Sequence, residues 1–361
     1  MIMIHGHGGN IYEWAKKLNC SLDEIIDMSS NINPLGSPPG LLENIKDRLK
    51  QIHSLPEVDS KTLTRTFALF FDKHEDQVVC GSGSTEFIYL LPQILQSKNV
   101  LIIAPTYADY EDSCKRLGAQ VHVRVTNASK KFQPALSNQN LDGIDTVFLC
   151  NPNNPSGYFI PFVQLKAWCK AYPDIRFIID ESYLQFSPEY EFETMIRSAL
   201  PNVIVLCSFS KIFAIPGLRL GFLVASPDIV KSFKNIDKPW HINTIAQLAG
   251  IYIFNNMLTV QNHIEKTIQH IQSERNRFED FLGRYPGVST FSSFAPYILI
   301  KLPEHIEGST ICAQLAKKKY LVRNCSNFNG LSDQYIRIAY KQSDENKHVL
   351  EHLKKILSKQ S

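Results

Sequence analysis

The sequence predicts an α/β protein with a mostly parallel β-sheet flanked by helices, joined to a smaller α+β domain. Three observations lead to this prediction. Short, strongly apolar stretches such as NVLIIAP at 99–105, TVFLC at 146–150 and IRFIID at 175–180 have strand length and suit strands covered on both faces. Helix-like stretches separate them, which is typical of parallel sheets with crossover helices. The 361 residues also exceed what one core of about 250–300 residues normally holds.

The expected elements of the larger domain follow one another along the chain. Helical spacing of apolar residues from Phe87 to Leu95 predicts a helix over 84–97, directly after an apolar VVC stretch. Further strands are expected at 99–105, 119–125, 146–150, 175–180, 202–208 and 218–226, with helices at about 107–117 and 161–172. A long helical region is expected over 241–283.

The pattern changes after this helical region. Strand-like YILIKL (297–302), YLVRNC (320–325) and YIRIAY (335–340) are interleaved with a helix near 309–319 and a final helix from Ser343. The first 50 residues, with PLG and SPPG turns, are expected to join these elements. We therefore predict a small domain from 1–50 and 285–361, and a large domain from 51–284.

The composition fits a soluble globular protein, with 44% hydrophobic and 20% charged residues. A net charge of +3 without a long basic run gives no indication of a nucleic-acid partner. No apolar run approaches the roughly 18 residues of a membrane span, and no signal sequence is recognisable. Eight cysteines without a CxxC pair favour a reducing compartment and no zinc site. We expect a cytoplasmic protein without membrane, nucleic-acid or metal partners.

Glycine- and proline-rich segments follow two of the expected apolar strands. GSGST at 81–85 opens a helix, where backbone N–H groups, hydroxyls and the helix dipole can hold an anion. A plain turn with a helix cap is the simpler explanation of this segment alone. In NPNNPSG at 151–157, two prolines and a glycine fix a turn and asparagine supplies an amide. A purely structural turn is the alternative.

Charged side chains follow two further strands. Asp180 comes after a strongly apolar stretch and needs a partner that compensates its charge, so a structural ion pair is the alternative to a functional role. Lys211 lies in SFSK after VIVLC, where burial can lower the pKa of the amine until it is nucleophilic. Ser208, Ser210 and Arg219 lie beside it and could bind a phosphate. For Lys211 alone, an ordinary surface lysine is the alternative.

Together the four segments match the requirements of one cofactor. Pyridoxal phosphate needs an amine for its aldehyde, a carboxylate for its pyridinium nitrogen, donors for its phenolate oxygen and a phosphate pocket. Ligands bind at the carboxyl ends of the strands in such sheets. NPNNPSG, IIDESY and SFSKIFAIPGLRLG, with spacings of 26 positions from Asn154 to Asp180 and 31 from Asp180 to Lys211, resemble the fold-type I enzymes of the aminotransferase class I/II superfamily.

The resemblance implies a role for each residue. The catalytic residues are expected to be Lys211, which binds the cofactor's aldehyde and moves a proton, Asp180, which keeps the pyridine nitrogen protonated, and Tyr183. Asn154 and Tyr183 would hydrogen-bond the phenolate oxygen, and Tyr107 would stack on the ring. The other cofactor-binding residues would hold the phosphate: Ser84, Thr85, Ser208, Ser210 and Arg219.

Segments nearer the two ends resemble a subgroup, the threonine-phosphate decarboxylases of cobalamin biosynthesis. These segments are HGGNIYEWAKKL, DMSSNINPLG, LVRNCSNFNGL and YIRIAYKQSDEN. The resemblance implies that five residues bind a phosphorylated amino acid: His7, Asn31, Asn154, Arg323 and Arg337. HGHGGN at 5–10 is then interpreted as a flap over the site, because Gly8 and Gly9 let the backbone turn closely.

The implied activity is decarboxylation of L-threonine O-3-phosphate to aminopropanol phosphate, or of L-serine O-phosphate to ethanolamine phosphate, for the cobalamin nucleotide-loop linker. One methyl group is worth only about 1–3 kcal/mol in a pocket, so both substrates stay open. A histidinol-phosphate-type aminotransferase, which shares Arg323 and Arg337, is the alternative. A non-catalytic, cofactor-binding regulator is the third interpretation, and the intact Lys211 and Asp180 disfavour it.

The resemblance also implies a homodimer with its sites at the subunit interface. Members of the family commonly have a tyrosine near 53–59 that reaches the cofactor phosphate of the partner subunit. Here the segment is HSLPEVD, and Leu55 has no hydroxyl. We therefore expect either another donor or a missing contact with lower cofactor affinity.

Overall fold

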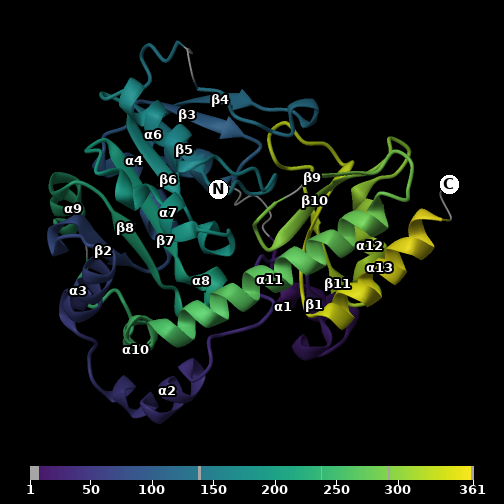
Figure 1. The fold of residues 1–361 in the computed structure, drawn as a ribbon, viewed down its shortest axis with the longest axis horizontal. Helices are drawn as coiled ribbons and strands as arrows, with labels where there is room; N and C mark the ends of the chain where they lie inside the picture. The colour runs from purple at the N-terminus through teal and green to yellow at the C-terminus, as the bar shows by residue number, and fades with distance from the viewer. Residues whose placement is uncertain (1–7, 137–139, 237, 292, 359–361) are drawn as a thin grey trace.

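A seven-stranded sheet forms the centre of the computed structural model, which describes residues 8–136, 140–236, 238–291 and 293–358 (Figure 1). The strand order is β2-β8-β7-β6-β5-β3-β4. Neighbouring strands from β7 to β4 pair in parallel, whereas β8 is antiparallel to both of its neighbours. The strands are β2 (Val78–Gly81), β3 (Asn99–Ala104), β4 (Gln120–Val125), β5 (Thr146–Cys150), β6 (Arg176–Asp180), β7 (Val203–Ser208) and β8 (Gly221–Val224).

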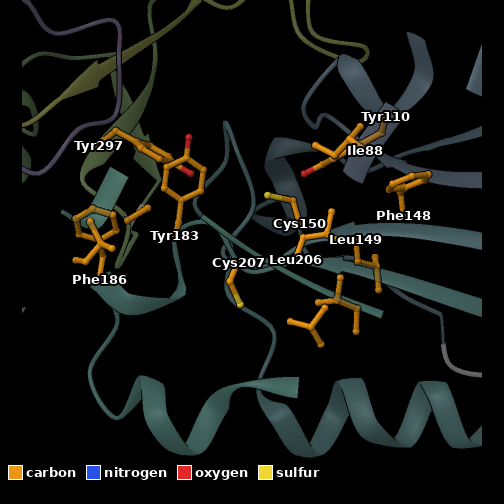
Figure 2. Close-up of a cluster of buried hydrophobic side chains, with 14 of the residues drawn as sticks. Ile88, Tyr110, Phe148, Leu149, Cys150, Tyr183, Phe186, Leu206, Cys207 and Tyr297 are labelled. Carbon is orange, nitrogen blue, oxygen red and sulfur yellow. The ribbon is translucent and has the colours of Figure 1, made fainter. Parts of the chain in front are cut away.

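Helices pack on this sheet, and every residue of β2, β5, β7 and β8 is buried. The expected mostly parallel sheet with covered, apolar strands is confirmed. The helices of this part are α2 (Leu41–Asp47), α3 (Lys61–Phe70), α4 (Ser84–Ile94), α5 (Asp109–Leu117), α6 (Phe162–Ala171), α7 (Tyr190–Glu193), α8 (Phe209–Ile212), α9 (Pro227–Lys234) and α10 (Thr244–Asn255). Figure 2 shows the apolar side chains at the carboxyl ends of the strands, with Tyr183 beside Tyr297.

A second, antiparallel sheet lies beyond the long helix α11 (Met257–Leu282), which runs from the first sheet toward the second in Figure 1. Its order is β12-β13-β10-β9. Its elements are β9 (Ser289–Phe291), β10 (Tyr297–Lys301), β12 (Arg323–Asn324) and β13 (Tyr335–Ala339), with helices α12 (Gly308–Ala316) and α13 (Ser343–Leu357).

The N-terminal segment lies against this second part of the chain. Strand β1 (Ile26–Asp27) pairs in parallel with β11 (Tyr320–Leu321). Helix α1 (Ile11–Leu18) places Ala15 in one apolar cluster with Ala316 and Leu321. The domain limits at 50/51 and 284/285 stay a prediction.

Three expected elements differ from the structure. The long helical region is two helices, because the chain leaves helical geometry at Asn256 (φ −122°, ψ 36°). YLVRNC divides into β11 and β12, which belong to different sheets. The strand expected at 218–226 is shorter, because Arg219 has a left-handed conformation (φ 56°) that precedes the extended residues.

Cys80, Cys150 and Cys207 are buried in β2, β5 and β7, with at most 6% exposure. None of the eight cysteines, which all lie within the described residues, forms a disulfide bond. Within the described residues, no helix combines the length and apolar character needed to cross a membrane.

Candidate active site

A cavity of about 180 Å³ lies at the carboxyl ends of the parallel strands. Its wall contains all ten residues expected to bind the cofactor: Ser84, Thr85, Tyr107, Asn154, Asp180, Tyr183, Ser208, Ser210, Lys211 and Arg219. Three further residues complete the wall, namely Tyr110, Cys150 and Ser182. The four polar segments therefore meet at one place, because parallel strands bring their carboxyl ends to one edge.

Lys211 lies on the short helix α8, directly after β7. Its carbonyl oxygen accepts a hydrogen bond from Asn33 N at 2.9 Å, which fixes the backbone here. Burial, followed by repulsion from Arg337 and Arg219, lowers the pKa of the Lys211 amine to about 8, against an opposing attraction from Asp27. Such an amine is partly neutral near pH 8 and can act as a nucleophile.

Asp180 ends β6 and is 4% exposed. Its carboxylate accepts hydrogen bonds from Tyr110 Oη at 2.8 Å and from Ser182 N at 2.9 Å. Burial raises the pKa of Asp180, although the hydrogen bonds from Ser182 and Tyr110 oppose the shift. Among the residues that the structure describes, no cation pairs with this carboxylate. A protonated ring nitrogen would supply that missing partner.

The end of the cavity near α4 is suited to an anion. Helix α4 begins at Ser84, so its first N–H groups have no intrahelical acceptor. Gly83 (φ +78°) allows the Arg219 guanidinium to approach, because a Cβ at this position would collide with it. Arg219 Nη2 donates to Thr85 Oγ1 at 3.5 Å. The buried Ser210 hydroxyl has no hydrogen-bond partner among the described residues, so it is available to a phosphate oxygen.

Two tyrosines, Tyr107 and Tyr183, also line the cavity. Tyr183 Oη accepts a hydrogen bond from Asn31 Nδ2 at 2.9 Å. Burial raises the pKa of Tyr183 to about 12, so the phenol keeps its proton and can donate it to a ligand oxygen. The Tyr107 ring lies edge-on to Tyr110, with 5.6 Å between ring centroids.

Arg337 lies beside this cavity but is not part of its wall. The side chain is 4% exposed, and its Nη1 donates to Asn154 Oδ1. Its Nη2 donates to the Ser29 carbonyl oxygen at 2.6 Å. Arg337 Nε and Asn31 Oδ1 are buried without a hydrogen-bond partner in the described part of the chain. An unused donor and an unused acceptor therefore lie at this end of the site.

Arg323 is opposite Arg337 in the register of β12 and β13. Its Nη2 donates to Asn327 Oδ1 at 2.7 Å, and its guanidinium lies 5.4 Å from the Phe328 ring centroid. Asn327 and Phe328 line a second cavity of about 120 Å³, which shares Tyr107 with the first. Neither Arg323 nor Asn31 belongs to the wall of the first cavity.

His7, predicted to bind the substrate, lies outside the described residues. The segment that follows it is described: Gly9 N donates to Ser29 Oγ at 2.8 Å. The described end of the HGHGGN segment therefore contacts Ser29, and the carbonyl oxygen of Ser29 accepts a hydrogen bond from Arg337.

Four residues of the site were missed by sequence reasoning, namely Tyr110, Cys150, Ser182 and Ser29. Tyr110 follows Tyr107 by three positions, and this spacing within the helix expected at 107–117 could have indicated it, although α5 begins only at Asp109. Ser182 lies two residues after Asp180, where its N–H can turn back to the carboxylate. Ser29 has no signal in the sequence, because its contacts come from residues 20 and 308 positions away.

This fold and this arrangement of groups are those of fold-type I enzymes that use pyridoxal 5′-phosphate. The sequence profile described as aminotransferase class I and II matches residues 23–353. The chain belongs to this family, and its cofactor is pyridoxal 5′-phosphate.

The chain is similar to relatives of two activities. The threonine-phosphate decarboxylase of Salmonella typhimurium is 31% identical over 361 residues, which covers 98% of this chain and 96% of the relative. A histidinol-phosphate aminotransferase of Methanococcus aeolicus is 29% identical over 352 residues, covering 96% and 94%. The adenosylcobalamin biosynthesis bifunctional protein CobDQ of Leptospira interrogans is 30% identical over 352 residues, and the chain spans 40% of its length.

Solved structures give the same two activities. L-threonine-O-3-phosphate decarboxylase from Porphyromonas gingivalis superposes with a TM-score of 0.82 at 26% identity, covering 92% of this chain and 99% of that one. The histidinol-phosphate aminotransferase from Clostridium acetobutylicum gives a TM-score of 0.82 at 30% identity with the same coverage.

The described residues fit the cofactor. The amine of Lys211 has a lowered pKa, the Asp180 carboxylate has no cationic partner among the described residues, and the Ser210 hydroxyl is unused. When bound, pyridoxal phosphate supplies an electron sink for the bond that breaks at the substrate Cα.

Proposed function

We propose that this chain decarboxylates a phosphorylated amino acid, L-threonine O-3-phosphate or L-serine O-phosphate. The observation that carries the proposal is the pair of arginines Arg323 and Arg337, which are opposite each other on neighbouring strands. Within the described residues, their hydrogen bonds go to amide and carbonyl oxygens rather than to carboxylates. Two guanidiniums without a carboxylate partner suit a dianionic phosphate, which each can bind through two N–H groups.

The position of the two arginines bears on which bond breaks. Only the Cα bond perpendicular to the cofactor ring can release its electrons into the π system. An enzyme that grips the substrate carboxylate near the ring plane presents the Cα–H bond. If Arg323 and Arg337 hold the phosphate, the carboxylate is free to stand perpendicular and leave as carbon dioxide. Substrate binding then selects the reaction.

The residues of the cavity would serve the steps before and after this cleavage. We assign the Lys211 amine to cofactor attachment, and then to returning a proton to Cα after carbon dioxide leaves. The Asp180 carboxylate keeps the cofactor's ring nitrogen protonated. The Tyr183 phenol and the Asn154 amide nitrogen donate to the phenolate oxygen, since Asn154 Oδ1 is occupied by Arg337. The 31% identity to a threonine-phosphate decarboxylase supports this assignment.

The second candidate is an aminotransferase that acts on histidinol phosphate. It is favoured by the 29% identity to such an enzyme and by the matching solved structure. The same two arginines would then hold the phosphate, and the Cα–H bond would break instead.

The test is an assay of the holoenzyme with L-threonine O-phosphate, L-serine O-phosphate and histidinol phosphate, each with and without a 2-oxo acid. We expect carbon dioxide and the phosphorylated amine from one of the first two substrates, without need of a 2-oxo acid. Formation of a 2-oxo product without carbon dioxide would contradict the proposal and support the aminotransferase.

We also propose a homodimer. Apolar side chains are exposed on α2 and on the segment between α2 and α3, with exposed fractions of 58% for Leu42, 55% for Ile52 and 73% for Leu55. Burial of these side chains against a second copy would remove them from water. Sedimentation analysis of the holoenzyme tests this, with a monomer as the contradicting result.

A further inference from the structure

Ser29 is a buried residue that contacts three separate parts of the molecule. Its carbonyl oxygen accepts a hydrogen bond from Arg337 Nη2 at 2.6 Å. Its hydroxyl donates to Asp27 Oδ1 at 2.6 Å and accepts from Gly9 N at 2.8 Å. The side chain and the backbone of one residue therefore join the N-terminal segment, the loop after β1 and the buried guanidinium.

Asp27 orients the Ser29 hydroxyl. Its Oδ1 also accepts from Ser29 N at 2.9 Å, so the peptide and the side chain of Ser29 are held by the same oxygen. Because the hydroxyl proton is directed at Asp27, a lone pair of Ser29 Oγ is left for the N–H of Gly9. Asp27 thus orients the Ser29 hydroxyl, and the hydroxyl oriented in this way accepts the N–H of Gly9.

The N-terminal segment approaches Ser29 closely. A Cβ at Gly8 would lie 2.5 Å from the Ser29 carbonyl oxygen and 3.0 Å from its Oγ. This carbonyl is the one that accepts from Arg337. Only glycine at position 8 allows the backbone to pass here, so any side chain would push the segment or Ser29 away.

We propose that Ser29 is a positioning residue that couples the N-terminal segment to Arg337. A rotation of the Ser29 peptide that breaks the Gly9 contact also turns the carbonyl that aligns the guanidinium. Conversely, an anion that fixes Arg337 fixes this carbonyl and stabilises the Gly9 contact, because coupling between two sites is reciprocal. The inference rests on the proposed function in one respect, namely that Arg337 binds the substrate's anionic group.

The test uses the holoenzyme and inorganic phosphate as the probe. Calorimetry gives the phosphate affinity, and hydrogen–deuterium exchange follows the backbone amides of residues 8–18. We expect phosphate to slow exchange at Gly9 in the original protein. In Ser29→Ala, we expect faster exchange there that no longer responds to phosphate, and a phosphate affinity lower by about tenfold.

Ser30→Ala is the matched control. The Ser30 hydroxyl also donates to Asp27, through Oδ2 at 2.5 Å, but among the described residues the Gly9 N–H donates to Ser29 Oγ and not to Ser30. We expect its phosphate affinity and its exchange at Gly9 to stay within about twofold of the original values. Equal effects of Ser29→Ala and Ser30→Ala, whether large or absent, would overturn the proposal.

Gly8→Ala perturbs the same contact without replacing Ser29, because the added Cβ would collide with the Ser29 carbonyl. This variant decides the question if Ser29→Ala does not fold. We expect the same loss of phosphate affinity as in Ser29→Ala, with an unchanged absorption spectrum of the bound cofactor. An affinity equal to that of the original protein would overturn the coupling. If the coupling is found but no phosphoamino acid releases carbon dioxide, the proposed function is refuted and the role of Ser29 is not. If carbon dioxide is released but the coupling is absent, the positioning role of Ser29 is refuted and the proposed function is not.

Discussion

The two ends of the candidate site are built in different ways. At the cofactor end, Asn154, Asp180 and Lys211 lie at the carboxyl ends of three adjacent parallel strands, β5, β6 and β7. At the substrate end, Arg337 comes from another sheet and contacts Asn154, 183 positions away, and Ser29, 308 positions away. The chemistry is thus carried by one rigid sheet edge. In the proposed function, the choice of substrate would depend on contacts between distant segments, so we expect changes at the two ends to have separable effects.

The largest effect is expected at the cofactor end, from Lys211→Ala. Loss of the amine removes both cofactor attachment and proton transfer, and we expect kcat to fall by at least about 10³-fold. Phosphate binding at Arg337 should change by less than about threefold, because within the described residues Arg337 acts on the Lys211 amine through charge repulsion and not through a hydrogen bond. Turnover and calorimetry measure the two quantities.

Lys341→Ala is the control for Lys211→Ala. Burial lowers the pKa of the Lys341 amine also, but this lysine is not part of the cavity wall. A loss of kcat as large as that of Lys211→Ala would contradict the assignment of Lys211.

The next largest effect is expected at the substrate end, from Arg337→Lys. An ammonium cannot reproduce the fork that contacts Asn154 and Ser29, so we expect KM for the phosphorylated substrate to rise by about 30- to 100-fold. Arg323→Lys should raise KM by only about tenfold, because a less buried guanidinium contributes less. Steady-state kinetics that show the reverse order, or a fall in kcat without a rise in KM, would contradict the predicted division between the ends.

A smaller effect is expected from pH, again at the cofactor end. Because the pKa of Lys211 is lowered from 10.5 to about 8, its amine is mostly protonated at pH 7 and mostly neutral at pH 9. Only the neutral amine attacks an aldehyde, so capture of the cofactor by the apoprotein should accelerate by about tenfold between these values and then level off. Stopped-flow absorbance follows the capture. A rate that keeps rising up to pH 10.5 would show that burial does not shift this amine.

The smallest effect is expected from Leu55→Tyr. If the proposed dimer places residue 55 near the partner subunit's cofactor phosphate, the added hydroxyl supplies one hydrogen bond. We expect cofactor affinity to rise by about fivefold, since a net hydrogen bond is worth about 1 kcal/mol. Leu55→Phe is the control, because it adds a ring without a donor. Equal affinities of the two variants would place residue 55 away from the cofactor.

The same division explains what the sequence could predict. Strands β3, β5, β6 and β7 are short, apolar and flanked by motifs, so local patterns predicted them, and the resemblance carried by those motifs predicted ten of the thirteen residues of the cavity wall. The break at Asn256 and the division of YLVRNC between two sheets could not be predicted, because tertiary contacts decide them. Ser29 was missed for the same reason. Two of its three partners, Gly9 N and Arg337 Nη2, are remote in the sequence, and the local bond to the Asp27 carboxylate leaves no distinctive motif.

The most direct test of the proposed function is to find which bond at Cα breaks. The holoenzyme is incubated with L-threonine O-phosphate and, separately, with L-serine O-phosphate in heavy water, and the products are analysed by mass spectrometry and proton NMR. We predict, for at least one of them, equimolar carbon dioxide and an amine that keeps the original Cα hydrogen and gains one deuterium. Recovered substrate that has exchanged its Cα hydrogen for deuterium, without carbon dioxide, would contradict the proposal.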